Sequence, residues 1–220
     1  VNALTVMANG DLVAGGSFVS AGGTPANHVA RWNGATWAGY GTGAFDTVYT
    51  VRGLANGTLV IGGGASSARI ASWNGFAFLP LGSGTDSDVR AIEQLPNGDL
   101  VAGGQFNRAG SLAANGIARW NGSTWSPLTT AGTDAQVSAL CTLPNGDLVA
   151  GGSFTFLEGT PANRIARWNG ATWSPLGTGL DGAVYALAAL PNGDVIAGGQ
   201  FTTAGGVAAS NIARWNGATW

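Results

Sequence analysis

The sequence contains few charged residues. Only 9% of its 220 residues are charged, against roughly a quarter in an average soluble protein. All nine basic residues are arginine, lysine is absent, and the formal net charge is −2. Because nucleic acids and anionic membranes are bound through clustered positive charge, we expect neither of them as a partner.

Cysteine, histidine and long apolar runs are also scarce. The single cysteine, Cys141, excludes an intrachain disulfide, and we expect it to be a small buried side chain. The single histidine, His28, cannot supply the several ligands of a copper oxidase, and no cluster has zinc spacing. No two carboxylates are singled out as a glycosidase pair, and no run approaches the roughly 20 residues of a membrane span. We therefore predict a non-enzymatic protein without a cofactor, a metal or a membrane-inserted segment.

What the sequence has is a repeat, which occurs five times and accounts for nearly the whole chain. We predict one domain over residues 1–220, with copies over 1–47, 48–88, 89–136, 137–183 and 184–220. The second copy is shorter. Its longest connection shrinks to residues 64–67, and it lacks the phenylalanine that the other copies carry at positions 18, 106, 154 and 201.

Each copy contains four short segments with strand character. In the last copy they are Val184–Leu190, Asp194–Phe201, Asn211–Trp215 and Thr219–Trp220. Asn-Gly pairs separate the first strand from the second and the third from the fourth, and they favour type I′ hairpin turns. No apolar stripe of helical period is present. Each copy is therefore predicted to be a four-stranded antiparallel meander.

The second strand of every copy ends in Gly-Gly, which indicates a close approach of another backbone or side chain. A tryptophan on the third strand and a second aromatic four or five residues later supply bulk beside that gap. Single four-stranded sheets cannot bury both faces, whereas sheets stacked around an axis can. We therefore predict an all-β fold, a five-bladed β-propeller. We expect a monomer whose ring closes by packing of the fifth blade on the first. The alternatives are five blades of a larger ring, or a chain that completes a ring by association.

The repeat resembles a known type. The pattern VIAGGQF…IARWNGATW resembles the kelch-type propeller repeat, and Trp-Asn-Gly-x-Thr-Trp-x-Pro-Leu-Gly is similar to repeats of secreted bacterial propellers and fungal Rax2-like surface proteins. The resemblance covers the whole chain. It implies a propeller of kelch-like blades at a bacterial cell surface or outside the cell, either alone or as part of a longer secreted protein. It implies little about activity, since kelch propellers range from binding scaffolds to oxidases.

Four copies share an Asp at the start of the second strand and an Arg twenty residues later. In the second copy both are replaced, by Thr58 and Ser72. The paired loss predicts that the two charges meet as structural ion pairs. The pairs are Asp11 with Arg31, Asp99 with Arg119, Asp147 with Arg167, and Asp194 with Arg214.

A meander places both Asn-Gly turns at one end of the propeller, here called the turn end. The connections between second and third strands, and between blades, lie at the other end, here called the variable end. The turn end is nearly identical in all copies and is interpreted as scaffold. The variable end differs between copies, so we expect a partner to bind there. The candidate residues are His28, Tyr49, Arg69, Arg90, Arg164 and Tyr185.

Two alternatives remain open beside this recognition module. A multivalent lectin would stack sugars on the second aromatics, Trp37 and Trp173 foremost, with Asn27 and Asn163 taking the hydroxyls. A structural spacer of a larger cell-surface protein would bind nothing. Calcium at the aspartates of the variable end (46, 86, 88, 134 and 181) is a lesser possibility without a recognised calcium-loop spacing. The identity of a protein or glycan partner is not encoded in any motif.

Overall fold

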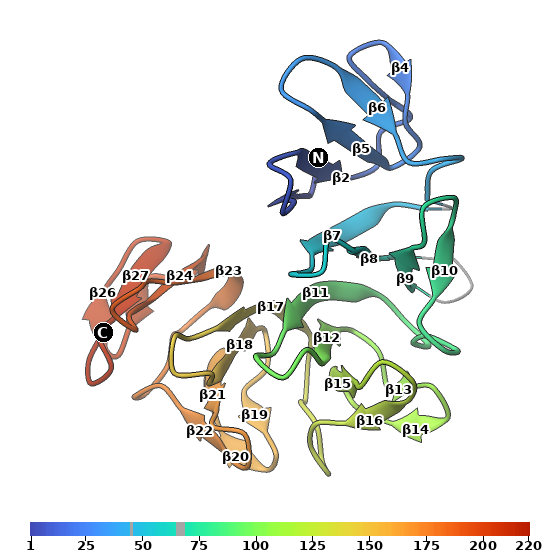
Figure 1. Cartoon of the computed structure of the whole chain (residues 1–220). Helices are drawn as coiled ribbons and strands as arrows, with labels where there is room; N and C mark the ends of the chain where they lie inside the picture. Colours follow the sequence, from blue (N-terminus) through green and yellow to red (C-terminus); the bar gives the residue numbers. More distant parts are fainter. Residues whose placement is uncertain (45, 65–68) are drawn as a thin grey trace.

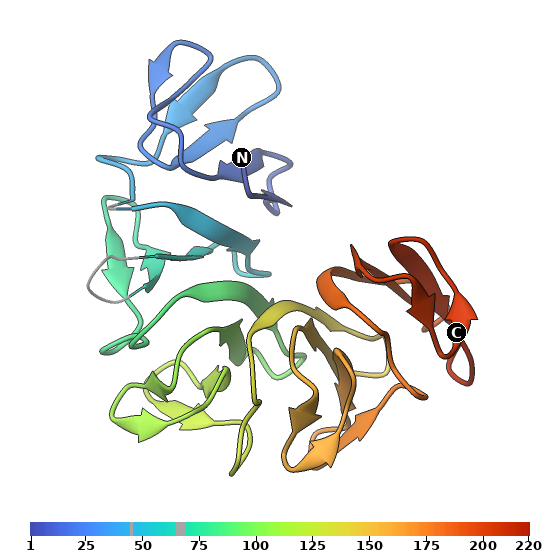
Figure 2. The same ribbon diagram turned by 180° about the vertical axis from the view of Figure 1, so that it is seen from behind.

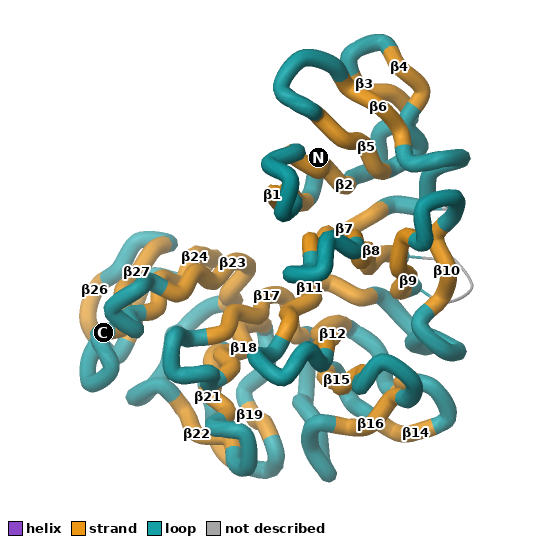
Figure 3. Tube along the Cα trace, in the orientation of Figure 1, coloured by secondary structure: helices purple, strands orange, loops and turns teal. Residues whose placement is uncertain are grey.

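A computed structural model describes residues 1–44, 46–64 and 69–220, and it is an all-β propeller of five blades (Figure 1). Strands and loops make up the whole of the described chain, without a helix (Figure 3). The predicted fold class is therefore confirmed. The shortened connection of the second copy, residues 65–67, lies outside the described residues.

The blades follow one another along the chain. Blade one holds β1 (Ala3–Val6), β2 (Leu12–Gly15), β5 (Val29–Trp32) and β6 (Trp37–Gly39). Blade two holds β7 (Val48–Gly53), β8 (Leu59–Gly63), β9 (Ile70–Trp73) and β10 (Phe78–Pro80). Blade three holds β11 (Val89–Gln94), β12 (Leu100–Gly104), β15 (Ile117–Trp120) and β16 (Trp125–Pro127). Blade four holds β17 (Val137–Thr142), β18 (Leu148–Gly152), β21 (Ile165–Trp168) and β22 (Trp173–Pro175), and blade five holds β23 (Ala183–Ala189), β24 (Val195–Gln200) and β27 (Ile212–Trp215).

Within each blade, neighbouring strands pair antiparallel in chain order. The predicted fourth strand of blade five, Thr219–Trp220, is not paired as a strand. The first strand of each blade lies innermost, where β7, β11, β17 and β23 surround the centre, and the later strands lie outward (Figure 1).

The Asn-Gly turns differ from the predicted type I′. Only the glycine of each pair has a positive φ, for example +90° at Gly98 and +94° at Gly122. In blade three, the amide of Gly98 donates to the carbonyl of Leu95 (2.9 Å), and the amide of Leu95 donates to the carbonyl of Asp99 (2.8 Å). This is a three-residue loop in which a tight turn is followed by a left-handed glycine. The same bonds close the turn of blade one, where Ala8 stands in place of a proline, so the three-residue length of the loop sets its type.

The connection between the second and third strands forms a small extra hairpin in four blades, which the sequence reasoning missed. These hairpins are β3 with β4 (Ser20–Ala21, Thr24–Pro25), β13 with β14 (Arg108–Ala109, Leu112–Ala113), β19 with β20 (Phe156–Leu157, Thr160–Pro161) and β25 with β26 (Thr203–Ala204, Val207–Ala208). The signal was present as a glycine-containing pair at each tip, such as Gly22-Gly23, where both φ angles are positive.

The core lies between blades rather than within them. Four clusters of buried side chains join blade one to two, two to three, three to four, and four to five. At each junction a valine of the following blade packs on the first glycine of the Gly-Gly pair. A methyl group added at Gly151, for example, would lie 2.6 Å from Cγ1 of Val184. The glycine is therefore needed to admit the neighbouring side chain.

The five blades form an open arc, not the closed ring that we expected from the sequence. Blades one and five lie on opposite sides of an opening, which is visible from both faces (Figures 1 and 2). None of the buried clusters among the described residues joins blade five to blade one. At the angle that the four junctions set, five blades do not complete the circle.

The glycine contact makes a direct prediction for stability. Gly151→Ala should lower the free energy of unfolding by about 1–3 kcal/mol, because the added methyl overpacks the junction with Val184. Gly198→Ala is the matched control in blade five, where the nearest described atom to the added methyl lies 3.9 Å away. It should be nearly neutral by urea unfolding, and equal losses in the two variants would contradict this account.

Candidate binding surfaces

A β-bulge at the start of the first strand directs one variable side chain in each of four blades. The register between first and second strands shifts between Val48 and Thr50 in blade two, and at the corresponding place in blades three to five. Bulges re-aim side chains and are common near functional sites. The bulged residues are Tyr49, Arg90, Ser138 and Tyr185. The scaffold thus presents tyrosine twice, arginine once and serine once at equivalent places.

Two of these residues meet across the junction of blades two and three. The guanidinium of Arg90 lies 3.7 Å from the ring centroid of Tyr49, and its Nη2 is 2.7 Å from Oδ2 of Asp88. Both charged side chains are largely withdrawn from solvent. Cation–π stacking and ion pairing together fix the guanidinium plane. The result is a rigid aromatic and cationic cluster with its charge locally balanced.

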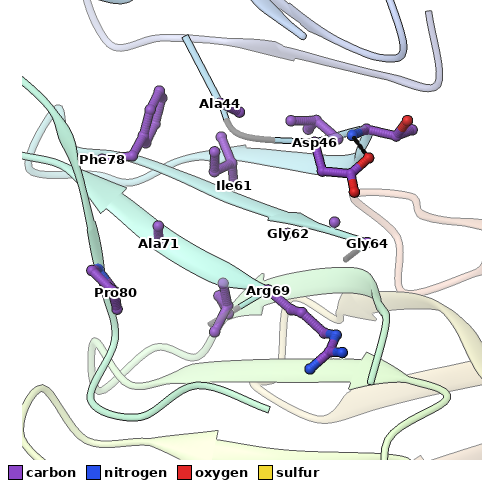
Figure 4. Close-up of a pocket in the computed structure, with 13 residues that line it drawn as sticks. Ala44, Asp46, Ile61, Gly62, Gly64, Arg69, Ala71, Phe78 and Pro80 are labelled. Atoms are coloured by element: carbon purple, nitrogen blue, oxygen red, sulfur yellow. Dashed lines mark hydrogen bonds between the residues drawn. The ribbon is translucent and has the colours of Figure 1, made fainter. Parts of the chain in front are cut away.

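A cavity adjoins this cluster (Figure 4). It is lined by the apolar side chains of Ile61, Ile70 and Phe78, with Asp46 and Arg69 also on its wall. Gly64 lies between cavity and cluster, since an added methyl there would be 3.3 Å from the Tyr49 hydroxyl. In blades three to five a phenylalanine is fully buried just after the Gly-Gly pair, namely Phe106, Phe154 and Phe201. The second copy lacks this phenylalanine, so the cavity lies in the copy that departs from the repeat.

The other predicted residues do not join this cluster. Tyr185 donates to Oε1 of Gln200 (3.0 Å) within its own blade, and its side chain is exposed. Nη1 of Arg69 donates to the Thr85 carbonyl (3.0 Å). His28 and Arg164 lie in blades one and four. The structure thus brings Tyr49 and Arg90 together and leaves the rest distributed over the variable end.

The residue immediately before each third strand has a left-handed backbone. The φ angles are +66° at His28, +57° at Arg69, +68° at Arg164 and +67° at Asn211, with glycine only at position 116. The reason is a pair of backbone hydrogen bonds that close the loop. In blade four, Arg164 donates to the carbonyl of Phe154 (2.9 Å) and accepts from the amide of Gly152 (2.9 Å). These hydrogen bonds hold the residues in the left-handed region, although this conformation costs a non-glycine residue about 1–2 kcal/mol.

Aspartates of the variable end fasten the small hairpins. Oδ1 of Asp181 accepts from the amides of Thr202 (2.9 Å) and Thr203 (2.8 Å), and Oδ2 accepts from the Thr202 hydroxyl (2.6 Å). Asp134 binds Thr155 and Phe156 in the same way. The Thr202 hydroxyl, followed by the backbone amide of Thr203, lowers the pKa of Asp181 to about 2. The carboxylate oxygens are thus already used by the protein. Within the described residues no group of three or more His, Cys, Asp or Glu is placed to hold a metal.

The side chains proposed for sugar binding are largely engaged in packing. Asn27 and Asn163 donate to the carbonyls of Thr42 and Thr178 (3.0 Å each) and so tie down the loops between blades. Trp37 and Trp173 are half-buried beside the tryptophans of their third strands, with Trp37 5.6 Å from Trp32 between ring centroids. One amide donor of each Asn side chain is therefore already used by the protein.

Grooves between blades open at the turn end, which the sequence reasoning treated as scaffold. Such grooves lie at three junctions. One wall comes from the first Asn-Gly turn and the third strand of one blade, and the other wall includes the third-strand tryptophan of the next blade. Their main lining residues are Asn9, Arg31 and Trp73; Asn56, Ser72 and Trp120; and Asn145, Arg167 and Trp215. Only the placement of one blade against the next creates them, so no motif within a single copy could reveal them.

The conserved acidic and basic residues of the repeat meet within single blades. The Arg Nε to Asp Oδ2 distances are 3.5 Å for Arg31 and Asp11, 2.5 Å for Arg119 and Asp99, 3.5 Å for Arg167 and Asp147, and 2.6 Å for Arg214 and Asp194. The aspartates are mostly covered and the arginines half-exposed, as expected for pairs that brace the third strand against the second.

A further ion pair lies on the inner strands. Nη2 of Arg52 is 2.5 Å from Oε1 of the buried Glu93, which also accepts from the Thr142 hydroxyl (3.3 Å). Burial raises the pKa of Glu93, although Arg52 acts in the opposite direction. Burial, and then the charge of Glu93, raise the pKa of the Cys141 thiol to about 12. Cys141 is therefore a thiol of low reactivity in a packed strand.

Comparison with known proteins places the chain among propellers. A family model described as a β-propeller domain of unknown function, DUF5122, matches residues 8–33 and 143–170. The comparison with curated proteins gave no match. No described helix has the length and apolarity needed to cross a bilayer.

Solved propellers resemble the whole arc. The extracellular domain of the one-component system BT4673 of B. thetaiotaomicron is 10% identical over 97% of this chain, with a TM-score of 0.63. This chain covers 26% of that domain's length. YCF48 bound to D1 peptide matches with 17% identity, a TM-score of 0.54, and coverage of 97% of this chain and 66% of the other. The WD40 propeller of Doa1 matches with 16% identity, a TM-score of 0.54, and coverage of 84% and 56%. At these identities the likeness concerns the fold.

The hydrogen bonds that Asp181 accepts predict that stability decreases in acid. The folded pKa of Asp181 lies below its ordinary value of 3.8, so its contribution to stability is present above about pH 4 and is lost as the pH falls towards about 2. Asp181→Ala should therefore lose less unfolding free energy than the unmodified chain over that interval, measured by urea unfolding. Thr202→Ala should give an intermediate slope, and parallel profiles for all three proteins would contradict the assignment.

The left-handed backbone of Arg164 predicts how replacement by glycine changes the free energy of unfolding. Arg164→Gly should leave the free energy of unfolding unchanged or raise it by about 1 kcal/mol, because the strain at φ +68° disappears and the entropy cost of glycine offsets part of the gain. Arg167→Gly, three residues later in the strand, is the control and should be destabilising. Thermal unfolding of both variants measures the contrast, and an equal loss in the two would show that the Arg164 side chain stabilises the loop.

Proposed function

We propose that the chain is a non-enzymatic recognition module that binds a protein segment at the variable end. The observation that carries this proposal is the set of bulges. They present Tyr49, Arg90, Ser138 and Tyr185 from equivalent places of a scaffold that otherwise repeats. The backbone repeats from blade to blade, and the bulged side chains differ. A binding surface needs this combination of a fixed backbone and variable side chains.

The cluster of Tyr49, Arg90 and Asp88 has the chemistry of a protein-binding centre. Tyrosine and arginine are enriched among the residues that dominate interface energies. The stacked guanidinium is already oriented, so little side-chain freedom is lost on binding. The adjoining cavity beside Ile61 and Phe78 would accept an apolar side chain of the partner. A short peptide with an apolar anchor and a hydrogen-bond acceptor for Arg90 fits both features.

A structural neighbour supports a peptide ligand. YCF48, whose fold this chain shares, is described in complex with a D1 peptide. That complex belongs to YCF48, and its ligand is not transferred to this chain. It supports the proposal that a propeller of this kind takes up a peptide.

A lectin is the second candidate, and a specific observation favours it. The turn-end grooves repeat at three junctions with a tryptophan, an asparagine and, at two of them, an arginine. Aromatic faces stack on sugar rings, and amides and guanidinium groups bind hydroxyls. The equivalent sugar sites would then lie in these grooves and not on Trp37 and Trp173.

We also propose kelch-like or Rax2-like repeats and an extracellular place for this protein. The repeated Trp-Asn-Gly-x-Thr-Trp motif and the extracellular bacterial domain among the fold neighbours support this location. A spacer in a larger surface protein would share the same scaffold without a ligand. Binding experiments distinguish the three functions.

Selection from a random peptide library displayed on phage tests the proposal. Peptides selected by the 220-residue chain should lose at least tenfold in affinity when Arg90→Ala is introduced, because the oriented guanidinium is removed from the cluster. Ser138→Ala alters an equivalent bulge outside the cluster and should bind as before. Failure to select any peptide, or equal binding by the two variants, would contradict the assigned surface.

A glycan array, run with calcium and again with chelator, tests the lectin. Sugar binding reduced in Trp215→Ala and unchanged in Trp37→Ala would assign the turn-end grooves. The reverse pattern would assign the second aromatics. An array without any signal in both conditions would exclude the lectin.

A further inference from the structure

The first and last blades carry the two separated halves of a junction that the structure forms four times elsewhere. At each internal junction, valine Cγ1 of the following blade would lie 2.5–2.6 Å from a methyl group added to the second-strand glycine. The partners are Gly15 with Val48, Gly62 with Val89, Gly103 with Val137, and Gly151 with Val184. A second apolar residue of the same strand, such as Ile92 on Gly62, completes the contact. The junction is thus a hole made by glycine and filled by two side chains.

The hole of blade five is unfilled among the described residues. The atoms nearest to a methyl at Gly198 are Cβ of Ala186 at 3.9 Å and the carbonyl oxygen of Asn211 at 4.0 Å, both from its own blade. Beside it, Ile212 is 65% exposed. The corresponding residues of the other blades, Val29, Ile70, Ile117 and Ile165, are at most 1% exposed. Blade five therefore presents the same face as the internal blades, but uncovered.

The matching side chains are uncovered on blade one. Val1 stands at the position of Val48 and is 75% exposed. Leu4 stands at the position of Val51 and is 59% exposed, whereas Val51 is buried. The two faces lie on opposite sides of the opening in the arc, so they do not meet within one copy (Figures 1 and 2).

We propose that blade five of one copy docks on blade one of a second copy of this chain. The occupant is identified by the four internal junctions, since each shows that a blade bearing a branched apolar pair fits a blade bearing the glycine hole. Both faces are apolar at their contact positions, and Val1 and Leu4 of a second copy supply the missing pair. The contact is head-to-tail, because each copy gives one face and receives the other, so copies join into a ring or a filament.

Sedimentation velocity of the 220-residue chain over a concentration series tests this association. The mass should rise above the 21.9 kDa of one chain as concentration increases. Gly198→Leu fills the hole and Leu4→Asp places a charge on the opposite face, and each variant alone should remain a monomer. Phe76→Asp removes an 87% exposed aromatic elsewhere and should leave association unchanged. Circular dichroism and thermal unfolding establish that each variant is folded.

Mixing the two blocked variants gives the sharper test. The Leu4→Asp copy keeps an intact blade-five face and the Gly198→Leu copy keeps an intact blade-one face, so an equimolar mixture should form a 1:1 dimer of twice the chain mass. Neither variant alone should do so. A chain that stays monomeric at every concentration would overturn the proposal. Association that survives both substitutions, or variants that fail to complement each other, would equally overturn it.

Discussion

The contact between a glycine of one blade and a valine of the next is the constraint on which the structure depends. A four-stranded sheet has two faces to cover, and in blades two to four each face is covered by a neighbouring blade. The glycine lets the valine approach until a methyl group would overlap it, as at Gly62 and Val89. Every buried cluster lies at such a junction. Blade spacing, the course of the arc and the uncovered faces at its two sides all follow from this one contact.

The scaffold separates its structural charges from its variable side chains. Asp and Arg pair within blades, aspartates such as Asp181 hold the small hairpins, and Asn163 ties a loop between blades. These polar groups are therefore engaged in holding the scaffold together. In blades two to five a bulge then adds one side chain, and the strands are paired again directly beyond it. Recognition can therefore change from blade to blade while the fold remains constant.

Blade two shows how a departure from the repeat acquires meaning in three dimensions. It lacks the Asp–Arg pair and the buried phenylalanine of its neighbours. A cavity lies beside Gly64, next to the Tyr49 and Arg90 cluster. The sequence marked this copy as unusual. The structure shows that its cavity lies beside the stacked Tyr49 and Arg90 side chains.

The sequence by itself determined the blade. Period, Asn-Gly turns, Gly-Gly pairs and paired tryptophans are local signals, and they predicted five antiparallel meanders and the partners of each Asp–Arg pair. The turn type was predicted wrongly because the loops are longer than the two residues of a type I′ hairpin, and the small hairpins were missed although Gly22-Gly23 signalled them. Only the tertiary structure decided the open arc, the stacking of Arg90 on Tyr49 and the grooves at the turn end. Each of these depends on the angle and distance between blades, which packed side chains set and which no single repeat contains.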